Sequence, residues 1–334
     1  MKNNYKVAVL GPIPYDHITT SNGTVIIKYG CATHPTIALA KLLAGRGEVW
    51  PVSHTRKKDA PEIKALLQDY ENVMTATIFD EMDQGDVIQL RFVDQNNRLE
   101  KQTAFMPPIR PHDVDLVLDA DAFVCVPISD YEVPLDTLQY IKEYRTNNGL
   151  IIFDAHGPTT AVTTTGDRVR RFWIERDLWL PSIDILKMNI EEASCCWFKK
   201  AYEPSELEQE YRDLTEEEMM DFGRHVLSFG VQALYITLDS RGCMIFSKEN
   251  GQVKAEFVAS VRVDEVIDTT GCGDAFAGGL AYGFLEDHAD YIRAAQFANA
   301  LGARRTQGTS FEVFQSLELT NELIRHNYGE AAKV

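Results

Sequence analysis

The stretch Val266-Ile-Asp-Thr-Thr-Gly-Cys-Gly-Asp-Ala-Phe-Ala-Gly-Gly-Leu280 joins an apolar strand end, a Gly-x-Gly turn and a run of small residues with helical character. Glycines let a chain turn tightly and bring backbone N–H groups close to an anion. A helix that starts near Asp274 adds its positive dipole end. A carboxylate at that point can accept the proton of an attacking hydroxyl. A lone Gly-x-Gly is weak evidence, but the whole run in this order predicts a phosphate-binding turn with a general base.

Outside this run, strand-like and helical segments alternate along most of the chain. The predicted strands are 7–11, 50–53, 122–127, 150–154, 184–188 and 233–238, and the predicted helices are 36–44, 61–69, 135–146 and 215–229. The last helix begins with a capping box formed by Thr215 and Glu218. This alternation predicts an α/β fold with a doubly wound, mostly parallel sheet and a ligand site beyond the carboxyl ends of its strands.

Two stretches interrupt the alternation. Residues 18–29 and 76–104 contain strand-like segments of alternating polarity, such as Val87–Val93, with no helix between them. We interpret them as a small β lid built from two insertions, and the alternative is a pair of surface hairpins. The remaining residues (1–17, 30–75 and 105–334) then form one core, in which the acidic stretch Glu203–Glu218 is expected to be an exposed loop and helix face.

Composition narrows the class of protein. The 334 residues carry a formal net charge of −17, which disfavours binding to nucleic acid or an anionic membrane surface. No apolar run approaches the length of a membrane span. None of the six cysteines forms a Cys-x-x-Cys pair, so a zinc site or a disulfide framework is not expected. These features predict a cytoplasmic protein whose partner is a small molecule.

The decisive run resembles a known signature. From Asp268 to Gly279 it is similar to the Asp-Thr-x-Gly-Ala-Gly-Asp-x-Phe-x-x-Gly motif of the ribokinase-like, or PfkB, carbohydrate kinases, with Cys272 where Ala is commoner. The resemblance implies a ribokinase-like fold, ATP and Mg²⁺ as cofactors, and Asp274 as the catalytic base. It also implies that the amides of Gly271, Cys272 and Gly273, with that of Asp274, form an anion hole for the transferred phosphoryl group.

Further landmarks of the family imply the nucleotide side of the site. Lys187-Met-Asn-Ile-Glu-Glu192 resembles its Asn-x-x-Glu motif, which implies magnesium at Glu192, held through water. Thr237–Gly242 resembles its Thr-Leu-Gly-x-x-Gly strand end, with Asp239 in place of the first Gly, and Asn299–Gly308 resembles the helix and loop over adenine. Asp268 matches a position that often helps to bind a monovalent cation, K⁺ in this case. The implied nucleotide-binding residues are Lys187, Asn189, Thr237, Asp239, Gly242, Thr270 and Asn299.

The substrate side resembles the family less. Gly11-Pro-Ile-Pro-Tyr-Asp16 is similar to the first strand and turn, whose Asp holds substrate hydroxyls, so Asp16 takes that role. The next motif of the family, Gly-Gly with an Asn some five residues on, is replaced by Gly30-Cys-Ala-Thr-His-Pro-Thr36. Gly30, Cys31 and Thr36 are the implied substrate contacts, although a threonine lacks the paired donor and acceptor of a carboxamide. The usual Gly-Asp pair after the second strand is also missing, so the pocket is remodelled and no particular sugar is implied.

Plainer alternatives stand beside these interpretations. Asp274 could be a helix N-cap, and the pair Asn189 and Glu192 could be an ordinary helix start. Cys272 lies at a predicted helix N-terminus, which favours an acidified, reactive thiol.

Three functions follow from the sequence: an ATP-dependent sugar or polyol kinase, a nucleoside kinase, and a catalytically weak ligand-binding or regulatory relative. A nucleoside kinase would need a slot for the base, which Phe92, Phe105 and Tyr29 could supply. A lid of this kind can also pair with its copy in a homodimer.

Overall fold

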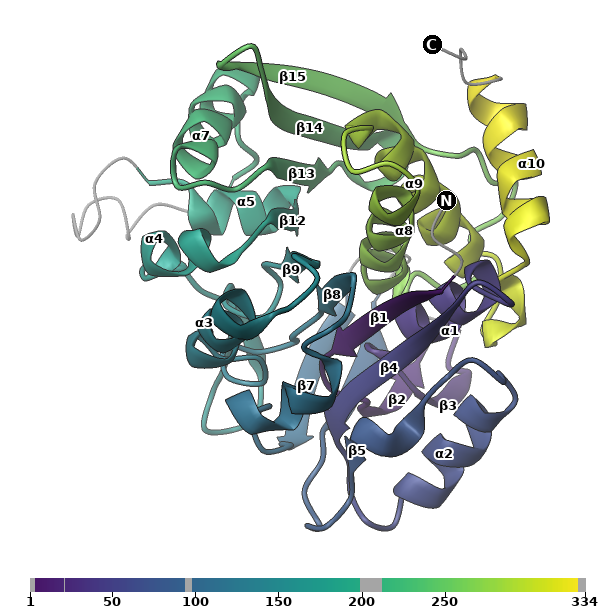
Figure 1. The fold of residues 1–334 in the computed structure, drawn as a ribbon. Coiled ribbons are helices and arrows are strands. Elements are labelled where there is room, and N and C mark those ends of the chain that lie inside the picture. Colours follow the sequence, from purple (N-terminus) through teal and green to yellow (C-terminus); the bar gives the residue numbers. More distant parts are fainter. Residues whose placement is uncertain (1–3, 21, 94–97, 199–211, 330–334) are drawn as a thin grey trace.

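The structure is a computed structural model that describes residues 4–20, 22–93, 98–198 and 212–329. Within these residues nine strands form one sheet in the order β15-β14-β13-β12-β9-β8-β1-β4-β5 (Figure 1). Neighbours from β13 to β5 run parallel, whereas β14 and β15 are antiparallel. This confirms the predicted α/β fold with a mostly parallel sheet. The strands are β1 (Tyr5–Leu10), β4 (Gly47–His54), β5 (Ile78–Phe79), β8 (Ala122–Cys125), β9 (Leu150–Asp154), β12 (Ile185–Asn189), β13 (Ala233–Thr237), β14 (Gly242–Glu249) and β15 (Gln252–Ala259).

Helices cover both faces of this sheet (Figure 1). One face carries α1 (Thr33–Leu42), α2 (Ala60–Gln68), α8 (Cys272–Glu286), α9 (Tyr291–Arg305) and α10 (Leu317–Tyr328). The other carries α3 (Leu135–Tyr144), α4 (Arg176–Trp179), α5 (Ile190–Cys196) and α7 (Glu216–Ser228). Short 3-10 turns complete the core: η1 (Thr75–Thr77), η2 (Pro111–Val117), η3 (Leu180–Ser182), η4 (Asp239–Arg241) and η5 (Phe311–Val313).

Glycines fix helix α8 tightly against its neighbour α9. A Cβ at Gly279 would lie 2.5 Å from the Cα of Ala298, and one at Gly283 would lie 2.4 Å from the Cα of Ala294. Larger residues at these two positions would push the helices apart. The small-residue run therefore holds the start of α8, which carries the signature turn, at a fixed place beside the sheet.

A second sheet forms the lid, in the order β3-β2-β6-β7. Its strands are β2 (Tyr15–Thr19), β3 (Val25–Tyr29), β6 (Val87–Phe92) and β7 (Arg98–Ala104), so both predicted insertions contribute. The bounds differ from the prediction in two respects. The lid begins at Tyr15, and Ile78–Phe79 pairs with β4 at the edge of the central sheet, because Ile78 is buried there.

Three apolar side chains, Ile18, Ile88 and Leu90, form the core of the lid. On β3, Val25 and Ile27 are exposed. An apolar outer patch is compatible with pairing of two lids, and the homodimer stays a prediction.

Two hairpins were not predicted. The strands β14 and β15 extend the central sheet, and β10 (Thr160–Val162) pairs with β11 (Arg168–Arg170) just after β9. The predicted capping box is present, since Thr215 accepts the N–H of Glu218 at the start of α7. Residues 203–211 of the acidic stretch lie outside the described residues. In the part of the chain that the structure describes, no helix has the length and apolar character needed to cross a membrane.

Candidate active site

The signature turn adopts a shape that only glycine permits. Gly271 is the N-cap of α8 with a φ of 84°, in the left-handed region. A Cβ at this position would lie 2.2 Å from the imidazole of His34 on α1. Because α8 begins at Cys272, Asp274 falls in its first turn, where the helix dipole favours negative charge.

Several N–H groups at this turn are free to bind an anion. Among the described residues, nothing accepts a hydrogen bond from the amides of Gly271, Gly273 or Asp274. The amide of Cys272 differs from the expectation, because it donates to the carbonyl of Thr269 at 3.2 Å. Three of the four predicted anion-hole donors, the amides of Gly271, Gly273 and Asp274, are therefore left to bind an anion.

Asp274 lies between the turn and the substrate side. Its Oδ1 is 3.9 Å from the Sγ of Cys31, which follows the lid strand β3. Burial raises the pKa of the Asp274 carboxyl, and nearby Lys187 and Arg98 only partly oppose this. A carboxylate with a raised pKa is a better proton acceptor than an ordinary one.

The substrate side brings Asp16, Gly30 and Cys31 together. Asp16 is only 4% exposed, and a Cβ at Gly30 would lie 2.0 Å from its Oδ2. Within the described part of the chain nothing donates a hydrogen bond to this carboxylate, which leaves it free for a substrate hydroxyl. Burial raises its pKa to about 8, with Lys28 opposing and Asp274 adding to the rise.

Thr36 does not join these residues. It is fully buried within α1, where its hydroxyl donates to the carbonyl of Ala32 at 2.7 Å. We therefore no longer include Thr36 among the expected substrate contacts. The sequence placed it there by its distance from Gly30, but the helix turns its side chain toward its own backbone.

A buried ion pair lies next to the glycine turn. Lys187, near the end of β12, donates to Asp154 Oδ2 at 2.7 Å, and its Nζ is 3.0 Å from where a Cβ of Gly273 would be. Burial and Glu192 raise the pKa of Asp154 to about 6, although Lys187 opposes them. Asp154 was not predicted from the sequence, although it is the one charged residue of the apolar strand Leu150–Asp154 and stands at its end.

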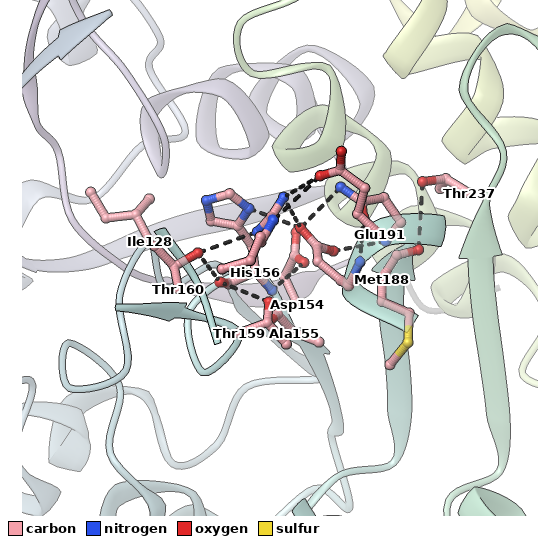
Figure 2. Close-up of polar contacts among 12 residues, drawn as sticks. Ile128, Asp154, Ala155, His156, Thr159, Thr160, Met188, Glu191 and Thr237 are labelled. Carbon is pink, nitrogen blue, oxygen red and sulfur yellow. Dashed lines mark hydrogen bonds and ion pairs between the residues drawn. The ribbon is translucent and has the colours of Figure 1, made fainter. Parts of the chain in front are cut away.

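Asn189 and Glu192 form the N-terminal capping box of α5. The two residues thus form the helix start that was the alternative to a magnesium site. The carboxylate of Glu192 also pairs with His156 at 2.8 Å and Arg170 at 3.6 Å. Figure 2 shows His156 beside Asp154, with Thr159 and Thr160 close by. Burial opposes ionisation of Glu192, but His156, Lys187 and Arg170 together hold its pKa below the ordinary value.

The other nucleotide-side residues occupy strand and helix ends. Thr237 ends β13 and donates weakly to the Met188 carbonyl at 3.5 Å (Figure 2). Asp239 has a φ of 53°, so it adopts the left-handed shape that the family's glycine would take at lower cost. Gly242 must be glycine, because a Cβ would lie 2.1 Å from the Val258 carbonyl oxygen.

Asn299 and Thr270 have contrasting environments. Asn299 on α9 donates to the carbonyl of Ala259 at 3.0 Å and to the hydroxyl of Tyr328 at 3.2 Å, so its amide holds α9 against β15 and α10. Thr270 donates its backbone N–H to Asp268 Oδ1 at 2.9 Å, while its buried hydroxyl has no partner among the described residues. Nucleotide contact stays a prediction for both.

The thiol of Cys272 is not acidified, contrary to the expectation. Burial raises its pKa, and the opposing effects of Lys187 and Arg98 are smaller. Position at a helix N-terminus was the only sequence signal, and burial depends on the rest of the fold.

Known proteins provide an independent comparison. A model described as "pfkB family carbohydrate kinase" matches residues 75–311, more than half of the chain. The chain belongs to the pfkB family of carbohydrate kinases. This confirms the resemblance found in the signature run.

Curated relatives of this pfkB chain match over shorter stretches. "Probable fructokinase-3" of Arabidopsis thaliana is 35% identical over 112 residues, which are 30% of this chain and 30% of that protein. An "Uncharacterized sugar kinase" of Archaeoglobus fulgidus is 33% identical over 96 residues, which are 29% of this chain and 36% of that protein. The matches thus span about a third of the length of each relative.

Solved structures show that the pfkB chain has the ribokinase-like fold. Ribokinase from Giardia lamblia has a TM-score of 0.73 at 17% identity, covering 96% of this chain and 99% of that one. A pyrophosphate-dependent kinase in the ribokinase family has a TM-score of 0.72 at 17% identity, covering 92% and 98%. A Burkholderia thailandensis nucleoside kinase in complex with ADP-inosine has a TM-score of 0.70 at 19% identity, covering 98% of each.

Proposed function

We propose that this chain transfers a phosphoryl group from ATP to a hydroxyl of a sugar or sugar-like alcohol, with Asp274 as the general base. One observation carries the proposal. Asp274 lies in the first turn of α8, 3.9 Å from the Sγ of Cys31 on the substrate side. Beside it are the amides of Gly271 and Gly273, which have no hydrogen-bond partner among the described residues. A proton acceptor and an anion-binding turn thus share one point between the two halves of the site.

The chemistry is a direct displacement. Asp274 accepts the proton of the acceptor hydroxyl, and the hydroxyl oxygen bonds to the terminal phosphorus of the donor. The bond from that phosphorus to the bridging oxygen breaks, and its electron pair leaves with ADP. The free amides of the turn and the ammonium of Lys187 stabilise the negative charge on the transferred group. Asp16, with its pKa raised by burial, would hold a second hydroxyl of the acceptor.

The family implies magnesium, and the residues of this site would contact the ion only through water. Within the described residues, no group of three or more His, Cys, Asp or Glu side chains could hold a metal ion. Glu192 already accepts from His156 and from the backbone N–H of Asn189, so it would contact the ion through water. When bound, magnesium supplies charge neutralisation on the donor phosphates, whose oxygens would provide its remaining ligands.

The aromatic residues that a base slot would need do not gather. Tyr29 packs against Tyr15 and donates to Glu62, Phe105 packs against Tyr131, and no ring contact within the described chain joins Tyr29 to Phe105 or Phe92. This arrangement favours a sugar or polyol over a nucleoside. The regulatory alternative is disfavoured because a pure binder has no need of a base at the phosphate turn.

The test is a coupled assay of ADP release with ATP and magnesium across sugars, polyols and nucleosides. Asp274→Asn should keep the fold and lose at least about 100-fold in turnover with the best acceptor, because it removes the general base. Asp264→Asn is the matched control, since Asp264 is an exposed aspartate in the loop before the same turn. The melting temperature of each variant should confirm folding.

The outcomes separate the alternatives. Acceptor-dependent ADP release that disappears in Asp274→Asn establishes the kinase and names its substrate class. Near-normal turnover in that variant contradicts the role of Asp274. Pyrophosphate is tested as a second phosphoryl donor. If phosphate is released from pyrophosphate and no ADP is released from ATP, the donor is pyrophosphate and the proposed acceptor chemistry is unchanged. Silence across the panel with ATP binding intact would favour the regulatory alternative.

A further inference from the structure

The carboxylate of Asp268 is held by three donors of the chain itself. Its Oδ2 accepts from Lys28 Nζ at 2.5 Å and from Arg305 Nη2 at 2.7 Å, and its Oδ1 accepts the N–H of Thr270 at 2.9 Å. All three charged side chains are almost fully buried, with exposures of 8% for Lys28, 1% for Arg305 and 5% for Asp268. Burial opposes ionisation of Asp268, but Lys28 and Arg305 outweigh it and lower its pKa.

This arrangement does not fit the monovalent cation that the family implies at Asp268. A bound K⁺ needs several oxygen ligands with free lone pairs facing it. Here Oδ2 of Asp268 already accepts from an ammonium and a guanidinium, and Oδ1 accepts a backbone N–H. A third positive charge beside these two would be repelled in a poorly solvated site. The reaction proposed above therefore needs no monovalent cation at Asp268.

Lys28 reaches Asp268 from the lid. It lies on β3 directly opposite Asp16 on β2, so the two side chains share the face of the lid sheet that meets the core. Its ammonium therefore connects lid strand β3, which pairs with the strand that carries Asp16, to the loop that enters the glycine turn. The two partners, Lys28 and Asp268, are 240 residues apart in the sequence.

Arg305 joins the same carboxylate to the other side of the turn. Its Nε donates to His34 Nδ1 at 3.1 Å, and its Nη1 donates to the carbonyl of Gly308. The ring of His34 lies against the Cα of Gly271, where a Cβ would be only 2.2 Å from it. The guanidinium thus links Asp268 to the residue that supports the left-handed glycine.

We propose that Lys28 is a positioning residue which, together with Arg305, takes the place of the monovalent cation beside the glycine turn. The two side chains supply the fixed positive charge and hold Asp268 in place. Asp268 in turn holds the Thr270 amide, which keeps the glycine turn in its anion-binding shape. The inference rests on the proposed kinase function for its kinetic consequences. Its cation-binding consequence stands apart from any activity.

The first experiment measures binding without turnover. The melting temperature of the full chain is recorded in tetramethylammonium chloride and in KCl at equal ionic strength. A ligand that binds the folded state raises the melting temperature, so the parent protein should melt at the same temperature in both salts. A rise in KCl would show a K⁺ site and overturn the proposal, whether or not an acceptor has been found.

The second experiment uses Lys28→Ala, with Lys28→Arg as the conservative variant. Lys101→Ala is the matched control, because Lys101 is a half-exposed lysine on the lid strand β7. With the best acceptor in tetramethylammonium chloride, kcat of Lys28→Ala should fall between about 10- and 100-fold while the Kd for ATP is unchanged, as expected for a misplaced turn. Lys28→Arg should keep most of the activity.

Chemical rescue distinguishes the cation role from a general loss of structure. Ethylammonium or K⁺ should restore part of the lost kcat in Lys28→Ala, and tetramethylammonium should not, because it cannot donate a hydrogen bond and is too large. A kcat equal to that of Lys101→Ala, or a reduced kcat that neither small cation restores, would overturn the proposal. Absence of acceptor-dependent turnover in the parent protein would instead refute the proposed function, and the melting experiment would still decide on K⁺.

Discussion

Asp16→Asn tests the electrostatics of the substrate side without needing a substrate. Asp16 is only 4% exposed, and burial raises the pKa of its carboxyl from 3.8 to about 8. Between these two values the folded chain keeps a proton that the unfolded chain releases. The folded state therefore binds more protons, and the free energy of unfolding must fall as the pH rises through this window.

The magnitude follows from proton linkage. One proton held by the folded state alone changes the free energy of unfolding by about 1.4 kcal/mol per pH unit. The whole shift sets a ceiling of about 6 kcal/mol, and relaxation of the folded state reduces it. Asparagine has nearly the same shape and does not titrate. The variant should therefore gain stability relative to the parent by about 1.4 kcal/mol per pH unit between about pH 5 and pH 7, with the difference levelling off above the raised pKa.

Urea unfolding at several pH values measures this difference directly. Asp264→Asn is the control, because it makes the same change at an exposed aspartate. Two further variants sharpen the assignment. Asp274→Asn should narrow the pH window, because it removes a negative charge that raises the pKa of Asp16. Lys28→Ala should widen the window, because it removes a positive charge that lowers this pKa. A difference between Asp16→Asn and the parent that stays constant with pH would refute the reasoning, because Asp16 would then titrate alike in both states.

Two other predictions concern the glycine turn. Gly271→Ala should abolish turnover and lower the melting temperature, because a Cβ would lie 2.2 Å from the His34 ring and φ is 84°. Gly302→Ala should be tolerated, because the nearest contact of its Cβ would be 3.4 Å away, and equal behaviour of the two variants would contradict this geometry. Cys272 should react with iodoacetamide more slowly near neutral pH than an unperturbed cysteine, because burial raises its pKa; mass spectrometry of the alkylated protein reads this out, and rapid labelling would show that the thiol is acidified after all.

The sequence alone determined the features that depend on neighbours along the chain. Apolar runs bounded by turn residues located the buried strands, and the capping box of Thr215 and Glu218 located the start of α7. The glycine turn, the helix after it and the place of Asp274 in the first turn are likewise local, because backbone freedom and helix polarity are set by a few adjacent residues. The family signature lies in the same short run, so the order of its residues is enough to recognise it.

Only the tertiary structure decided which charges meet and how deeply they are buried. Lys28 and Asp268 are 240 positions apart, and Lys187 pairs with Asp154 across 33 positions, so no local pattern announces either pair. The raised pKa values of Asp16 and Cys272 arise mainly from burial, which the whole fold produces. Thr36 was misplaced for the same reason: its spacing from Gly30 was known, but the direction of its side chain was set by the helix that contains it.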